Sequence, residues 1–129
     1  MLYALLIYVE PWTTTPEQDA KVMEAYNAFS AEAVAADVMR GGEALHEAKT
    51  ATSVRVRNGQ TLVTDGPFAE TKEEFGGFYL IDAPNLDEAI KWAAKIPGAS
   101  RGTVEVRPVA DMAAAPDGAN AAPAGIAPG

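Results

Sequence analysis

Two stretches that are apolar at successive positions constrain the fold of this chain more than any other feature. Residues 2–9, LYALLIYV, end at Glu10-Pro11, and residues 77–81, GFYLI, have a similar composition. Both stretches are rich in branched and aromatic side chains, which is typical of β-strands. A strand whose sheet has one solvated face alternates apolar and polar residues. The sequence therefore predicts a sheet that is covered on both faces.

Two amphipathic helices are predicted beside these strands. Thr15-Pro16-Glu17-Gln18 has the residues of a capping box with proline at the first helical position, so a helix should run over 16–38 and end at Gly41-Gly42. A second capping pattern at 85–88 opens a helix that Pro97-Gly98 stops. The predicted apolar stripes are Val22, Met23, Tyr26, Phe29, Ala33 and Val34 in the first helix, and Leu86, Ala89, Ile90, Ala93 and Ile96 in the second.

The other segments follow the period of β-strands. Residues 53–57 and 61–64 flank Asn58-Gly59, the strongest two-residue hairpin signal, and residues 103–109 form a last alternating strand. The order strand, helix, hairpin, strand, helix, strand predicts an α+β fold, a ferredoxin-like sandwich with an antiparallel sheet and both helices on one face.

Two helices on one face leave the other face of the sheet uncovered. A second copy that packs sheet against sheet would cover it, and closed two-fold dimers are the commonest symmetry. We therefore expect a homodimer that forms an α+β barrel. The alternative is a monomer whose C-terminal tail folds over the sheet. The predicted domain spans residues 1–110, and residues 111–129 are an Ala/Pro/Gly-rich segment expected to be a flexible tail.

Composition excludes several classes of function. The chain has no cysteine and one histidine, so a thiolate nucleophile and a metal site with several imidazoles are ruled out, and we expect no metal. Nucleotide and cofactor motifs are absent, so we expect no cofactor. The net charge of −8 argues against nucleic-acid and anionic-membrane partners. The N-terminus lacks a positive n-region and a cleavage site, so we expect a cytoplasmic protein.

A family resemblance rests on residues 54–97, which read VRVRNGQTLVTDGPFAETKEEFGGFYLIDAPNLDEAIKWAAKIP, and on GTVEVRPV and LLIYVEPW at the two ends. Over about residues 1–110 the chain resembles the DGPF branch of the YCII-related family. The resemblance implies a dimeric α+β barrel and a biochemical role that is mostly unassigned. It also implies a regulatory partner linked to sigma factors, because some members are encoded beside them.

Two interpretations fit the DGPF segment. Asp65-Gly66 can end a strand with a permissive backbone, Pro67 fixes the next φ, and Phe68 can anchor the loop in the core. Alternatively, the rigid turn holds the Asp65 carboxylate at the mouth of a cleft. A dry setting there would raise its pKa and suit it to proton transfer. Both interpretations can hold together.

Further candidate residues lie outside this turn. His46 follows the glycine pair and is either a solvated imidazole or, within hydrogen-bond reach of Asp65 or Glu43, a general base. Tyr8 can present a phenol to a pocket or pack in the core. Arg107 can pair with neighbouring carboxylates or bind a substrate carboxylate.

Two functions of different classes remain. The first is a small cofactor-free enzyme, or a dimer that binds a small organic ligand, acting on a carboxylated or lactone-like molecule. Asp65 or His46 would transfer the proton, while Tyr8, Glu43, Phe68 and Arg107 would bind the substrate. The second is a non-catalytic ligand-sensing or protein-interaction module linked to sigma-factor and stress-response regulation.

Overall fold

The computed structural model describes residues 1–11 and 14–111, which are built around a four-stranded antiparallel sheet. The strands follow the spatial order β2-β5-β1-β6. Their bounds are β1 Leu2–Val9, β2 Met39–Ala44, β5 Glu74–Asp82 and β6 Thr103–Pro108. Apart from Asp111, the predicted tail lies outside the described residues.

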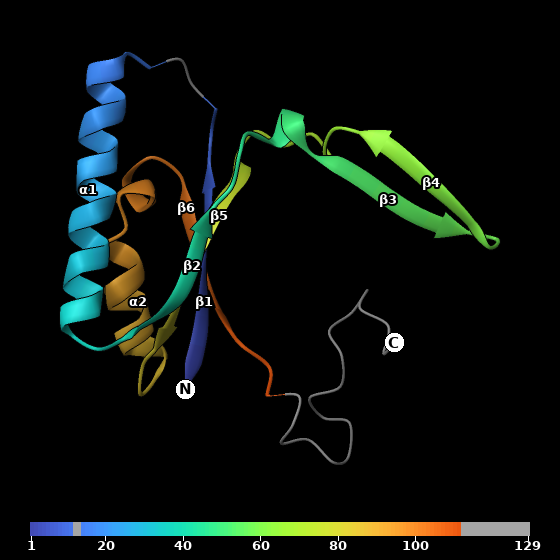
Figure 1. The fold of residues 1–129 in the computed structure, drawn as a ribbon. Coiled ribbons are helices and arrows are strands. Elements are labelled where there is room, and N and C mark those ends of the chain that lie inside the picture. The colour runs from blue at the N-terminus through green and yellow to red at the C-terminus, as the bar shows by residue number, and fades with distance from the viewer. Residues whose placement is uncertain (12–13, 112–129) are drawn as a thin grey trace.

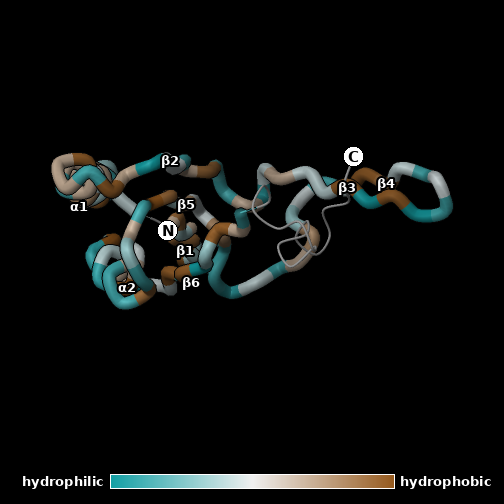
Figure 2. The backbone as a smooth tube through the Cα atoms, turned by 90° about the horizontal axis from the view of Figure 1, so that it is seen from below, coloured by the Kyte–Doolittle hydropathy of each residue, from teal (hydrophilic) through white to brown (hydrophobic). Residues whose placement is uncertain are grey.

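Both helices lie on the same side of this sheet (Figures 1 and 2). They are α1, Pro16–Ala35, and α2, Leu86–Ala94, and short 3-10 turns span Ala48–Thr50 and Pro97–Ser100. The arrangement confirms the predicted α+β class with an antiparallel sheet, and it is compatible with a ferredoxin-like fold.

Helix α1 begins as predicted and ends earlier. The Thr15 hydroxyl accepts from the Gln18 amide, and the Gln18 side chain accepts from the Thr15 amide, which completes the capping box. The helix ends at Ala35, because Asp37 adopts the left-handed conformation with φ 58° and the Val38 amide donates back to the Ala33 carbonyl. The prediction that the helix reaches Val38 and stops at the glycine pair was therefore wrong.

The glycine pair belongs instead to strand β2, which the sequence analysis did not predict. Residues 39–44 read MRGGEA and lack the branched side chains and the alternation that mark a strand. Strand β2 forms the sheet edge next to β5. The predicted hairpin is present as β3 Thr52–Arg57 and β4 Gln60–Asp65, and it makes a separate two-stranded sheet outside the main one. We call β3 and β4 the arm.

The side of the sheet that faces the helices holds the core. Tyr3, Leu5 and Ile7 of β1 point to this side and are buried. Phe29 of α1 contacts Tyr79 of β5 and Trp92 of α2, with ring centroids 4.8 Å and 6.2 Å apart. The two helices and the sheet are thus joined through one aromatic cluster. Of the stripe residues, Ala89, Ala93 and Ile96 are buried, whereas Met23, Val34, Leu86 and Ile90 are exposed.

The opposite side of the sheet, which we call the open face, has no helix over it. The strand register places two cross-strand rows there. In both rows the apolar side chains of β5 and β1 lie between residues of the edge strands. The rows are Glu43, Phe78, Leu6, Glu105 and Gly41, Leu80, Ala4, Arg107.

Replacing Gly77 should test how closely β2 and β5 approach each other. A Cβ at Gly77 would lie 2.7 Å from the backbone oxygen of Glu43, whereas a Cβ at Gly76 would meet only a Val9 methyl at 3.8 Å. We expect Gly77→Ala to lower the free energy of unfolding by about 1–3 kcal/mol, measured by urea denaturation. Gly76→Ala is the control because it loses the same unfolded-state entropy. Equal stability of the two variants would contradict this packing.

Candidate functional site

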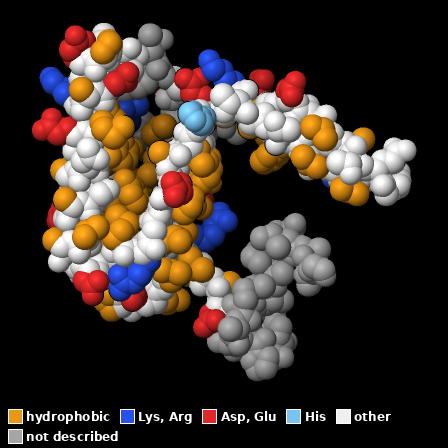
Figure 3. All heavy atoms as spheres, in the orientation of Figure 1, with side chains coloured by type: hydrophobic (Ala, Val, Ile, Leu, Met, Phe, Trp, Pro, Cys, Tyr) orange, Lys and Arg blue, Asp and Glu red, His pale blue; other side chains and the backbone are white. Residues whose placement is uncertain are grey.

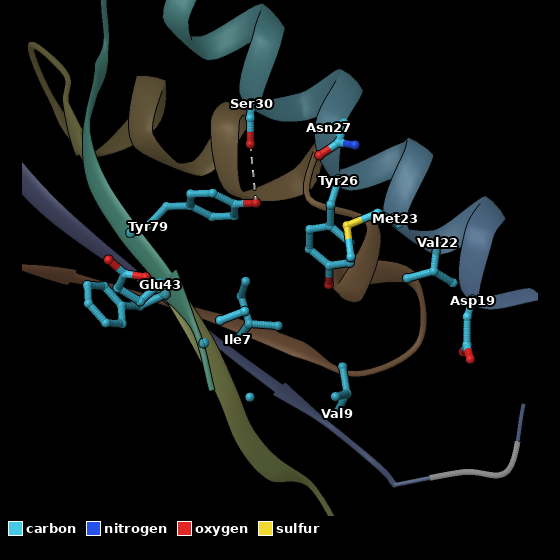
Figure 4. A pocket seen from close by; sticks show the side chains of 15 residues that line it. Ile7, Val9, Asp19, Val22, Met23, Tyr26, Asn27, Ser30, Glu43 and Tyr79 are labelled. Atoms are coloured by element: carbon cyan, nitrogen blue, oxygen red, sulfur yellow. Dashed lines mark hydrogen bonds between the residues drawn. The ribbon is translucent and has the colours of Figure 1, made fainter. Parts of the chain in front are cut away.

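A cavity of about 570 Å³ lies between residues 19–30 of α1 and the β2–β5 side of the sheet (Figure 4). Helix α1 forms its roof, and strands β1, β2 and β5 form its floor. The volume falls within the range of about 300–1,000 Å³ that ligand pockets occupy. The lining residues are Ile7, Val9, Asp19, Val22, Met23, Tyr26, Asn27, Ser30, Gly42, Glu43, Ala44, Gly76, Gly77, Phe78 and Tyr79.

The cavity exists because small residues occupy one part of the helix-facing side. In the register, Gly77 lies between Ala44 of β2 and Ile7 of β1, so two of these three neighbouring positions lack a large side chain. Four residues along β5, the corresponding position is Ile81, which is fully buried beside Tyr3. Helix α1 packs tightly over the filled part through Phe29, whereas it spans the part with small residues and leaves a space.

Hydroxyl and amide groups from α1 and β5 give the cavity a polar side. The hydroxyls of Ser30 and Tyr79 lie 3.5 Å apart, and Tyr26 and Asn27 come from the same stretch of the helix (Figure 4). Burial raises the pKa of the Tyr26 phenol, and nearby Tyr79 raises it further, against a smaller opposing effect of the Gly98 backbone. Tyr26 is therefore an uncharged phenol at neutral pH and acts as a hydrogen-bond donor or acceptor.

The charged residues among the described lining of the cavity are both acidic, Asp19 and Glu43. Glu43 shares its side of the sheet with Phe78, so its carboxylate points away from the cavity (Figure 4). Asp19 lies near the start of α1, where it is exposed and accepts a hydrogen bond from the Thr14 hydroxyl. Among the described lining residues there is no lysine, arginine or histidine. A buried anion would therefore find no positive partner there.

The predicted site residues do not line this cavity with their side chains. Asp65 ends β4 at the base of the arm, opposite Thr52, and is exposed. Gly66 follows with φ +94°, as the turn interpretation requires. The prediction that Phe68 anchors the loop in the core was wrong, because its side chain is 81% exposed. The loop returns from the arm, which forms its own sheet away from the helix-facing core.

The other candidates lie at separate places. His46 is exposed between β2 and the 3-10 turn, and within the described part of the chain no hydrogen bond or ion pair joins it to Asp65 or Glu43. Tyr8 lies on the open face with its ring centroid 5.5 Å from that of Phe75. Arg107 donates a 2.6 Å hydrogen bond to Glu105, which raises the pKa of Arg107.

The polar residues of the cavity were not predicted as site residues, because each has an ordinary structural interpretation in the sequence. Tyr26 was assigned to the apolar stripe of α1, and Tyr79 lies in a strand that is apolar throughout. Ser30 and Asn27 look like ordinary helix residues. The available signal was the pair of double glycines, Gly41-Gly42 and Gly76-Gly77, which mark strands that come close together and leave space above them.

Two other properties hold for the described residues. None of their helices has the length and apolar character that a membrane-spanning helix requires. They also contain no group of three or more histidine, cysteine, aspartate or glutamate side chains with the geometry to hold a metal ion.

The raised pKa of Tyr26 predicts a loss of stability in alkali. The unfolded chain releases this proton near the ordinary tyrosine pKa of about 10, whereas the folded chain retains it to higher pH. The contribution should therefore be constant below about pH 10 and fall as the pH rises from there through the folded-state pKa. Urea denaturation at a series of pH values should show a steeper alkaline decline for the wild type than for Tyr26→Phe. Tyr79→Phe should decline less steeply than the wild type, and parallel curves for wild type and Tyr26→Phe would contradict the assignment.

Comparison with known proteins agrees with the resemblance that the sequence carries. The model of the YCII-related domain matches residues 1–113. An uncharacterized protein of Rhizobium meliloti (strain 1021) is 42% identical over 115 residues, which cover 85% of this chain and 93% of that protein. The match spans the sheet, both helices, the arm and the cavity. The chain therefore belongs to the family of YCII-related domain proteins.

Proposed function

We propose that this protein is a homodimer that binds a small uncharged organic molecule in the cavity beneath α1. The observation that carries the proposal is the cavity itself, whose volume suits a small ligand and whose walls are mostly apolar with a few polar groups on one side. Binding, rather than a particular reaction, is the function that this geometry supports best.

The lining favours an aromatic or aliphatic molecule with one hydroxyl or carbonyl group. Ile7, Val9 and Val22 would contact its apolar part, and the hydroxyls of Tyr26 and Tyr79 would bind its polar group. A carboxylate would lose its hydration without gaining a positive partner. This preference differs from the carboxylated substrate that the sequence suggested, because Arg107 lies on the open face and is bound to Glu105.

Proton transfer by Asp65 or His46 stays a prediction. Both side chains are exposed, and neither lines the cavity. A sigma-factor-linked partner and a cytoplasmic location also stay predictions. None of the described surfaces singles out such a partner by its chemistry.

The proposed dimer follows from the open face. Leu6, Phe78 and Leu80 lie at its centre, and both helices are on the other side of the sheet. A second copy that packs its own open face there would bury these side chains in a two-fold arrangement and produce an α+β barrel. Because the cavity lies on the helix side, each copy would keep its cavity in the dimer.

Ligand charge should decide binding if the cavity is the site. Benzyl alcohol and benzoate share a ring and differ in charge, so they form a matched pair of probes. A ligand at ten times its Kd stabilises the folded protein by about 1.4 kcal/mol, which raises Tm by several degrees in a domain of this size. We expect benzyl alcohol to raise Tm in a thermal-shift assay and benzoate to leave it unchanged.

Two tryptophan variants on the same helix locate the binding. Val22→Trp places a large ring at the cavity, whereas Val34→Trp adds the same ring at an exposed position of α1 outside the lining. The response to benzyl alcohol should be lost in Val22→Trp and kept in Val34→Trp. A response that survives in both variants, or a larger response to benzoate, would refute the cavity as the site.

The dimer has its own test in a charge placed on the open face. Leu6→Glu should convert a dimeric wild type to a monomer in sedimentation-velocity experiments, because two-fold packing would bury the new carboxylate without a partner. Val34→Glu, at an exposed apolar position on the helix side, should remain dimeric. Circular dichroism would check that both variants are folded. A monomeric wild type, or a folded Leu6→Glu variant that stays dimeric, would overturn the proposed interface.

A further inference from the structure

We propose that the arm is an interprotomer clasp: its valine face packs on the open face of a second copy of this chain. This inference rests on the proposed dimer and goes beyond it, because it assigns the hairpin of each copy to the interface.

The arm exposes more apolar surface than a solvated hairpin usually tolerates. Val54, Val56 and Val63 are 60%, 59% and 63% exposed. The arm forms its own two-stranded sheet, separate from the main one. An isolated two-stranded hairpin is marginally stable in water, and packing against another element is its usual source of stability. The valines therefore indicate a surface that is covered in the assembled protein.

The register of the arm separates an apolar face from a basic face. Val54 lies directly opposite Val63, and Val56 lies opposite Thr61, so the three valines share one face. Arg55 and Arg57 alternate with them and lie on the other face, together with Leu62, which is 47% exposed. A hairpin that was simply solvated would have no reason to gather its valines in this way. The pattern instead predicts one face toward a partner and one toward water.

The direction of the arm indicates which partner surface is in reach. Figures 1 and 2 show the arm projecting on the side of the sheet opposite the helices, which is the side of the open face. In Figure 3 hydrophobic side chains gather along the arm and over the sheet, on both sides of the corner between them. A copy that covers the open face must therefore lie beside the arm. Two-fold symmetry then places the arm of that copy beside the first sheet.

Charge also favours a second copy as the occupant. The chain has a net charge of −8, and the arm, with two arginines and one aspartate, carries +1, so the remaining residues sum to −9. Within the described residues Arg55 and Arg57 form no ion pair with a carboxylate. Glu43 lies at one edge of the open face, and Glu105, which is paired with Arg107, lies at the other. Charge attraction between the arm and an otherwise acidic second copy therefore favours their association.

Neighbouring positions on β4 provide the test. Val63→Asp places a charge on the valine face, whereas Thr64→Asp places the same charge one residue away on the opposite face. Sedimentation equilibrium should show a dimer Kd at least about tenfold weaker for Val63→Asp, because a carboxylate would be buried without a partner. Thr64→Asp should change the Kd by less than about twofold.

Cross-linking tests the contact directly, since the natural chain has no cysteine. Copies with Val63→Cys and differently tagged copies with Leu6→Cys would be mixed and treated with a bismaleimide. A cross-linked product between the two chains, much weaker with Thr64→Cys in place of Val63→Cys, would support the clasp. Each copy has a single cysteine, so any cross-link between the two tags joins different molecules.

The possible outcomes distinguish the clasp from the proposed sheet-to-sheet dimer and from the proposed ligand cavity. A dimeric wild type that Val63→Asp leaves unchanged, with no cross-link from residue 63 to residue 6, would overturn the clasp and leave the sheet-to-sheet dimer standing. A wild type that is monomeric at all concentrations would overturn both. The response to benzyl alcohol reports on the cavity separately in each case.

Discussion

The architecture depends on one constraint, which is that the central strand β1 is apolar on both of its sides. Tyr3, Leu5 and Ile7 point toward the helices, and Leu6 with its neighbours points to the open face. The two helices cover only one of these sides. The helix side becomes the core and includes the cavity, while the other side needs a partner. The proposed ligand site and the proposed dimer interface are thus two consequences of the same strand, separated by the thickness of one sheet.

Much of the fold could be predicted from the sequence because local chemistry and final structure agree there. The capping residues at Thr15 and Asn85, the hairpin turn at Asn58-Gly59 and the apolar runs of β1 and β5 all have short-range signals. Strand β2 has no such signal, since MRGGEA derives its conformation from pairing with β5. The hairpin was recognised correctly, but a local pattern cannot tell which sheet a hairpin joins, so its place outside the main sheet was missed.

The candidate site was less predictable than the fold because small residues without large side chains create it. Asp65, His46 and Arg107 attract attention as reactive residue types. Asp65 lies at the base of the arm, His46 in the connection between β2 and the 3-10 turn, and Arg107 on the open face. The cavity arises where Gly42, Ala44 and Gly77 leave the sheet without large side chains, and a single sequence does not reveal which residues will lie above them. Tyr26 could be placed on the inner side of its helix from periodicity alone. Its position over a hollow required the three-dimensional arrangement.

The close approach of β2 and β5 has a consequence for how such a protein could diversify. A side chain at Gly42 or Gly77 would collide with the backbone of the neighbouring strand, so the floor of the cavity cannot change without damage to the sheet. The roof is formed by successive turns of α1, whose outer side is exposed to solvent. Substitutions at Val22, Met23 and Asn27 should therefore cost little stability. Relatives that bind different ligands should therefore differ mainly at the residues of α1 that line the cavity. A library of variants restricted to those roof positions would explore new specificities while the scaffold stays intact.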